Sequence, residues 1–179
     1  MTIKVDDNYL DLQSFLIIRD LCFYIEKSQF QDPLPWYWSA VLLEGTYDGD
    51  LDNNFQFCHK FYNNDYPQSP HIKYIEDLMD EMMKTNGARS FVRIKANLNP
   101  RSAKIIRHGF HIDVPEEWAD DVTTSIYYVN SNNGYTEFED GTKIESVENR
   151  LVSFPAKMRH SGTTCTDKQA RVVINFNYF

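Results

Sequence analysis

The sequence holds 179 residues with a mass of 21.1 kDa, of which 42% are apolar and 15% aromatic. This composition is enough to fill the core of one domain, which excludes a disordered or fibrous chain. The formal net charge is −8, and residues 1–90 carry all of the acidic excess. No basic stripe that could hold a phosphate backbone is visible, so duplex nucleic acid is excluded as an expected partner.

The chain shows no targeting or membrane segment. No run approaches the roughly 20 apolar residues that a membrane helix needs, and residues 1–7 lack the basic and then apolar pattern of a signal peptide. The cysteines Cys22, Cys58 and Cys165 are far apart and form no CxxC motif. We therefore expect a cytoplasmic protein with reduced, mostly buried thiols and no membrane partner.

Two helices are predicted in the N-terminal half. Residues 7–20 mix apolar and charged side chains at helical spacing. A clearer helix begins at residues 69–70, where Ser suits the N-cap and Pro the first helical position, and ends at the Asn-Gly pair 86–87. Its Ile and Met stripe, which includes Met83, predicts a buried face. The aromatic stretch 33–38 fits an edge strand, a lid over a pocket or a core seam, and the core seam is favoured.

From residue 91 onward the apolar period changes from helical to two. In residues 91–98 the even-numbered side chains are apolar and the odd-numbered ones from Arg93 are polar. We predict an α+β, mainly β fold, a jelly roll, in a single domain over 1–179. Residues 1–90 would form a helical and extended N-terminal support and 91–179 the jelly-roll core. Further strands are predicted at 109–114, 122–130, 135–139, 142–147, 150–154 and 171–179.

A metal-binding pattern lies within this strand-rich half. His111 and Asp113 are two residues apart in a predicted strand, so their side chains project from the same face. This pair alone is weak, because composition predicts about one such match in every two chains of this length. His160 follows 47 residues after Asp113, and two histidines with one carboxylate are the facial triad of non-haem iron. The alternative is a set of hydrogen-bonded polar residues in a metal-free jelly roll.

The terminal strand carries a further candidate. Odd positions from Arg171 include Asn175 and Asn177, while the even positions are apolar or aromatic. The odd face can therefore line a pocket while the even face is buried. A guanidinium deep in a barrel needs a partner, and a carboxylate bound through two hydrogen bonds is the natural one. His108, three residues before His111, is expected to face away from this site.

His111, Asp113, His160 and Arg171, in this order and spacing, make residues 90–179 resemble the Fe(II)/2-oxoglutarate-dependent dioxygenases. The likeness is to the small prolyl-4-hydroxylase-like branch of phages and marine bacteria, whose Gly-Thr-x-Phe strand resembles residues 134–138. The resemblance implies a double-stranded β-helix flanked by N-terminal helices. It also allows a phage-encoded protein acting in a host cell.

The resemblance assigns roles to these residues. It implies that His111, Asp113 and His160 bind Fe(II), and that Arg171 binds the distal carboxylate of the cosubstrate 2-oxoglutarate.

The resemblance also implies a tyrosine at the same carboxylate, on the strand after the His-x-Asp strand. Strand parity leaves Tyr127 or Tyr128, and Tyr127 is favoured. Asn97 or Lys95 would also line the pocket, and Asn97 is taken as the further cosubstrate contact.

The activity that the resemblance implies is hydroxylation of a C–H bond by O2, with release of succinate and CO2. A peptidyl substrate, with proline as the first choice, is favoured on branch likeness. The alternatives are the same chemistry on a small metabolite or free amino acid, and a non-catalytic jelly-roll binding module. Two positions depart from family patterns: Val173 replaces a frequent serine, and Asn177 replaces the second arginine of nucleic-acid demethylases.

Overall fold

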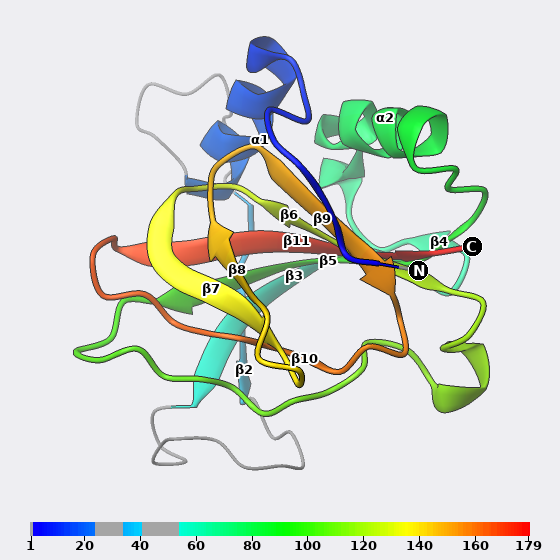
Figure 1. Cartoon of the computed structure of the whole chain (residues 1–179). Helices are drawn as coiled ribbons and strands as arrows, with labels where there is room; N and C mark the ends of the chain where they lie inside the picture. The colour runs from blue at the N-terminus through cyan, green and yellow to red at the C-terminus, as the bar shows by residue number, and fades with distance from the viewer. Residues whose placement is uncertain (1, 24–33, 41–53) are drawn as a thin grey trace.

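The computed structural model describes residues 2–23, 34–40 and 54–179 (Figure 1). No helix within these ranges has the length and apolar character needed to cross a membrane. The elements, in chain order, are β1 (Lys4–Asp6), α1 (Leu12–Phe23), β2 (Tyr37–Ala40), β3 (Phe55–Asn63), β4 (Tyr66–Pro67), η2 (Pro70–Tyr74), α2 (Glu76–Thr85), β5 (Phe91–Pro100), η3 (Glu116–Trp118), β6 (Thr123–Tyr128), β7 (Asn132–Phe138), β8 (Lys143–Ser146), β9 (Arg150–Pro155), β10 (His160–Gly162) and β11 (Ala170–Tyr178).

The strands form two antiparallel sheets. The larger sheet has the order β1-β9-β6-β11-β5-β3-β2, with β4 paired to β3, and the smaller sheet has the order β10-β7-β8. Isolated bridges from Arg107 to Thr163 and from His111 to His160 add the segment before β6 to the smaller sheet. This arrangement confirms the predicted mainly β jelly roll.

The pleat of β5 and β11 separates an apolar face from a polar one. Ile94 on β5 and Ile174 and Phe176 on β11 are fully buried in the largest core cluster. Ile18 of α1 and Leu78 of α2 belong to the same cluster, so the two helices cover this face of the larger sheet, as Figure 1 shows. The opposite face of these strands therefore turns toward the smaller sheet.

The predicted second helix is divided into two pieces. Ser69 is the N-cap, and its hydroxyl accepts a hydrogen bond from the N–H of His71 at 3.1 Å. The first turns form the 3₁₀ helix η2, and α2 starts after Ile75, whose φ of −115° interrupts the α-helical path. Met82 is fully buried but Met83 is 45% exposed. The prediction for Met83 is wrong, because it lies one position beyond the buried face.

Two strand-level predictions are wrong. Residues 37–40 form the edge strand β2, on which Tyr37 and Trp38 are 63% and 64% exposed rather than part of a core seam. Residue 33 lies outside the described ranges. Leu34 is buried in the largest core cluster and Trp36 packs against it, so the core-seam prediction is confirmed for these two residues. Residues 109–114 do not form a strand and pair only through His111. Their partner β10 is three residues long, so it provides few groups for a ladder.

Asn149, whose backbone is in the left-handed region, links the turn before β9 to the N-terminal segment, and substitutions at this residue test the link. Its φ is 57°, and its side chain bonds the N–H and carbonyl of Leu10 at 2.9 and 2.8 Å and the Tyr127 hydroxyl at 2.9 Å. We expect Asn149→Ala to lower the free energy of unfolding by about 2–4 kcal/mol, since it loses these bonds and strains the backbone. Asn149→Gly should lower the free energy of unfolding by less than Asn149→Ala, because glycine tolerates this φ. Urea unfolding measures both variants. If the Ala and Gly variants lost the same unfolding free energy, the left-handed backbone of Asn149 would not contribute to the destabilisation.

Candidate metal centre and cavity

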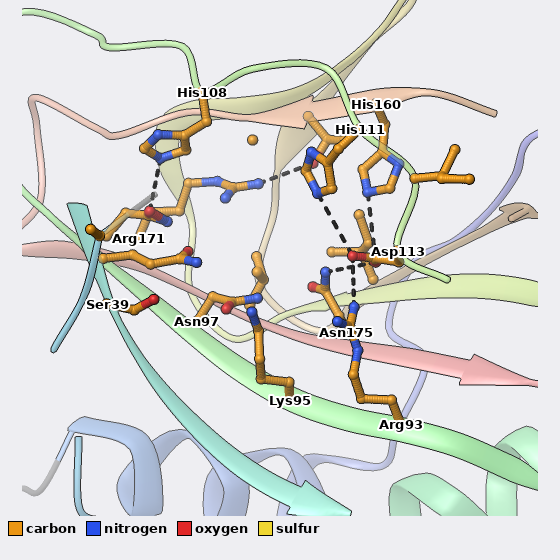
Figure 2. Close-up of a pocket in the computed structure, with 18 residues that line it drawn as sticks. Ser39, Arg93, Lys95, Asn97, His108, His111, Asp113, His160, Arg171 and Asn175 are labelled. Atoms are coloured by element: carbon orange, nitrogen blue, oxygen red, sulfur yellow. Dashed lines mark hydrogen bonds and ion pairs between the residues drawn. The ribbon is translucent and has the colours of Figure 1, made fainter. Parts of the chain in front are cut away.

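The three predicted metal ligands meet at one end of a cavity between the two sheets (Figure 2). One ligand atom from each of His111, Asp113 and His160 lies within 4.8 Å of the others. The two histidine Nε2 atoms are 3.7 and 3.8 Å from the two carboxylate oxygens of Asp113. The reciprocal backbone hydrogen bonds between His111 and His160, both 3.0 Å, hold the two histidines side by side.

The histidine rings are oriented as metal ligands require. Nδ1 of His111 lies 3.0 Å from the Gly109 carbonyl, and Nδ1 of His160 lies 3.2 Å from the Met158 carbonyl. A proton on Nδ1 that donates to a carbonyl leaves the Nε2 lone pair free to coordinate. The Nε2 distances to Asp113 are too long for hydrogen bonds, so the donor set fits a metal ion bound by two imidazoles and one carboxylate.

Asp113 is held as a carboxylate by its neighbours. Burial alone would raise its pKa, but Arg93, at 2.7 Å from Oδ1, together with His111 and His160 holds that pKa well below its usual value. Asn175 donates a hydrogen bond to Oδ2 at 3.2 Å. Sequence reasoning missed both Arg93 and Asn175 as partners of this ligand, although each lies on a polar strand face that it identified.

Arg171 lies at another wall of the same cavity and is 2% exposed. Its Nε donates to the Ser146 hydroxyl at 2.9 Å and its Nη2 donates to the Thr136 hydroxyl at 3.0 Å. A Cβ on Gly134 would come within 2.7 Å of its Cδ, so glycine leaves the space that this side chain fills. No carboxylate within the described ranges pairs with the guanidinium. Burial lowers its pKa, and a bound anion would offset that cost.

The tyrosine prediction is wrong in its choice of residue. Tyr127 lies in the core on the helix side of the larger sheet, where its hydroxyl donates to Asn149. Tyr128 lies on the other side, donates to Thr136 at 2.7 Å, and its ring centroid is 5.5 Å from the Arg171 guanidinium carbon. The error has a simple cause: a shift of one residue along a strand exchanges the two faces.

Asn97 lines the cavity as predicted, and so does Lys95. Asn97 is 7% exposed, and its side-chain oxygen has no hydrogen-bond partner among the described residues.

The expectation for His108 is wrong, because this residue also lines the cavity. Its segment is irregular, so strand parity does not apply to it. Its ring nitrogens lie 2.6 and 3.0 Å from the side-chain oxygens of Asn54 and Asn99. Burial, with a smaller contribution from Arg171, lowers the pKa of His108 to about 4.

The cavity has a volume of about 300 Å³ and a mixed lining. The larger sheet, including its N-terminal strands β2 and β3, provides most of its floor, and the smaller sheet provides the histidine side. The lining residues are Ser39, Ala40, Gln56, Arg93, Lys95, Asn97, Asn99, His108, His111, Ile112, Asp113, Ile126, Thr136, His160, Gly162, Arg171, Val173 and Asn175.

Comparison with known proteins identifies similar folds. No protein-family model matches the sequence, and a search of curated proteins finds no match. The solved structures do match. An oxidoreductase of the 2OG-Fe(II) oxygenase family from Burkholderia pseudomallei has a TM-score of 0.65 at 15% identity, covering 98% of this chain and 84% of its own.

Two further similar structures are prolyl hydroxylases. The viral collagen prolyl hydroxylase of Paramecium bursaria Chlorella virus-1, in a 2OG complex, has a TM-score of 0.57 at 12% identity and covers 99% of this chain and 95% of its own. A prolyl hydroxylase from Trichoplax adhaerens, in complex with a hypoxia-inducible-factor peptide, has a TM-score of 0.59 at 17% identity, with 99% and 83% covered. At these identities the likeness establishes the fold, a jelly roll shared with 2OG oxygenases.

Three buried histidines, His59, His108 and His160, make the stability of the metal-free protein sensitive to acid, because burial lowers the pKa of each. Burial lowers the pKa of His160 and of His108 to about 4, whereas an unfolded histidine has a pKa of about 6.5. The unfolded chain therefore binds more protons as pH falls, and unfolding free energy should decrease from pH 6.5 toward 4 by about 1.4 kcal/mol per unit for each histidine. Urea unfolding at several pH values measures this slope. His108→Gln should reduce it by about 1.4 kcal/mol per pH unit, and an unchanged slope would show that His108 does not contribute.

Proposed function

We propose that this chain is an Fe(II)- and 2-oxoglutarate-dependent oxygenase that hydroxylates a C–H bond. The observation that carries the proposal is the placement of two groups in one cavity: the His111, Asp113 and His160 cluster, and a buried arginine, Arg171, without an anionic partner among the described residues. The shared fold with 2OG oxygenases supports it. In a metal-free binding module the histidine Nε2 atoms would be expected at hydrogen-bond distance from Asp113, whereas they lie 3.7 and 3.8 Å from its carboxylate oxygens.

His111, Asp113 and His160 would hold Fe(II), which, when bound with 2-oxoglutarate and O2, supplies the oxidation of a C–H bond to C–OH with conversion of 2-oxoglutarate to succinate and CO2. The protein positions these ligands through the backbone and side-chain contacts described above. Arg93 and Asn175 hold the Asp113 carboxylate ionised and oriented.

Arg171 would bind the distal carboxylate of 2-oxoglutarate through charge-assisted hydrogen bonds. The hydroxyls of Ser146 and Thr136 already fix the guanidinium, and the Tyr128 ring packs against it. Val173, at the position where family members often carry serine, is an apolar residue of the cavity lining. The proposed cosubstrate contact is therefore Arg171, with Tyr128 beside it in the place first given to Tyr127. The side-chain oxygen of Asn97, unpaired among the described residues, needs a hydrogen-bond donor that the 2-oxoglutarate dianion lacks, so Asn97 is not kept as a cosubstrate contact.

The proposed substrate is a peptidyl group, with proline as the first candidate. The Trichoplax relative of this fold is a prolyl hydroxylase in complex with a peptide, which supports this choice. A small metabolite or free amino acid is the second candidate, supported by the limited cavity volume of about 300 Å³.

Loading the protein anaerobically with Fe(II) and 2-oxoglutarate tests the site directly. We expect the weak visible charge-transfer band of the chelate in wild type and its loss in His160→Ala, since one of three ligands is removed. Absorbance titration measures it, with metal analysis of the same samples. Bound metal without the band would contradict 2-oxoglutarate chelation, and absence of metal would contradict the whole site.

Arg171→Met should raise the KM for 2-oxoglutarate at least tenfold, because the distal carboxylate loses its cationic partner. Succinate release at varied 2-oxoglutarate measures this effect. The adjacent tyrosines are matched variants: Tyr128→Phe should raise the same KM severalfold by loosening Arg171, while Tyr127→Phe should lower only stability, by about 1 kcal/mol. An effect of Tyr127→Phe on the KM with none from Tyr128→Phe would reverse the assignment.

A further inference from the structure

The charges that line the cavity do not balance. Arg93, Lys95 and Arg171 face it as cations, whereas Asp113 is its one carboxylate among the described residues. Apart from its histidines, the lining therefore has an excess of two positive charges in a protein whose net charge is −8.

The proposed cofactors do not remove this excess. Fe(II) carries two positive charges and 2-oxoglutarate two negative charges, so together they leave it unchanged. Arg93 is already committed to Asp113 and to the side-chain oxygen of Asn177, at 2.7 and 3.1 Å. Arg171 is assigned to the cosubstrate. Lys95 is the remaining cation, and no carboxylate of the described residues forms an ion pair with it.

The position of Lys95 suits a role in binding the substrate. It lies two residues from Arg93 on the same face of β5, and opposite Asn175 of β11, which contacts Asp113. Lys95 lines the cavity, and in Figure 2 its side chain rises from β5 with its tip between Asn97 and Asn175. Burial and the neighbouring Arg93 lower the pKa of Lys95, a cost that a bound anion would offset.

Two asparagine side chains beside Lys95 provide hydrogen-bond acceptors for a bound molecule. The side-chain oxygens of Asn97 and Asn175 are buried and have no hydrogen-bond partner among the described residues. Each can accept an N–H from a bound molecule, and an unmet buried acceptor is costly. A cation flanked by two N–H acceptors is complementary to a carboxylate that has an N–H group a few bonds away.

We propose that the substrate carries a carboxylate close to the C–H bond that is hydroxylated, and that Lys95 binds it while Asn97 and Asn175 accept hydrogen bonds from an adjacent N–H. This inference rests on the proposed oxygenase function and replaces proline, the first candidate substrate given above, by an acidic group. The chemistry fits either an acidic residue within a peptide or a free acidic amino acid. A neutral prolyl peptide would leave the half-buried Lys95 without an anionic partner among the described residues.

The test uses acids paired with their amides, so that only the charge differs. The panel contains the free amino acids aspartate, asparagine, glutamate and glutamine, and the same four residues as acetylated, methylamidated peptide units. The enzyme with Fe(II), saturating 2-oxoglutarate and O2 is assayed for a product heavier by one oxygen. We expect the kcat/KM of at least one acid to exceed that of its amide tenfold or more. Whether the free amino acid or the peptide unit reacts shows whether the substrate is a free acid or an acidic residue within a peptide.

Lys95 variants separate this role from cosubstrate binding. Lys95→Met should reduce kcat/KM for the acid at least tenfold, and Lys95→Arg should retain most of it, while the KM for 2-oxoglutarate stays within twofold of wild type. Lys73→Met, on the exposed 3₁₀ helix η2, is the matched control. A neutral prolyl peptide used equally by wild type and Lys95→Met would overturn the proposal, as would a raised KM for 2-oxoglutarate or the lack of any acid preference.

A binding measurement keeps the proposal separate from the oxygenase assignment. Calorimetry on the metal-free protein, with acetyl-aspartate methylamide and its asparagine counterpart, should show binding of the acid that is lost in Lys95→Met. That result would support the anionic site even if wild type formed no succinate, which would contradict only the oxygenase assignment. Equal binding of the acid and the amide would overturn the proposal for Lys95.

Discussion

The site depends on the alternation of side chains along two adjacent strands, β5 and β11. Even-numbered residues such as Ile94 and Ile174 enter the core beneath the helices, and odd-numbered residues such as Lys95 and Arg171 enter the cavity. The antiparallel register places Arg171 opposite Asn99. One pleated pair therefore supplies both the hydrophobic stabilisation of the fold and the charged floor of the cavity, so neither strand can shift by one residue without losing both.

A layer of charge between two sheets is stable only where each charge has a partner. Asp113 has Arg93 and Asn175, and Arg171 has two hydroxyls and an aromatic ring. Hydroxyls satisfy the donors of a guanidinium but do not neutralise it. The two sites at which compensation is incomplete, Arg171 and Lys95, are thus the places where anionic ligands would gain most from binding.

The sequence predicted those features of the fold and the site that depend on the spacing of residues along the chain. The triad, Arg171, the faces of β5 and β11 and the jelly-roll class follow from alternation and motif order, and the structure brings these residues together. Tyr127 was placed on the wrong face because one residue of offset decides parity. His108 was missed because its segment is irregular. The contact between Arg93 and Asp113 depends on how distant segments meet, which no local pattern encodes.

The described N-terminal strands and helices pack directly on the strands that carry the site. β3 pairs with β5 from Phe57 to Asn63, and β2 extends the sheet so that Ser39 lines the cavity. Helices α1 and α2 cover the apolar face of the strands that carry the charged floor. Without residues 1–90, β5 would become an exposed edge with one bare hydrophobic face. The His-x-Asp, His and Arg residues lie in one half of the sequence, but the sheet that holds them requires both halves.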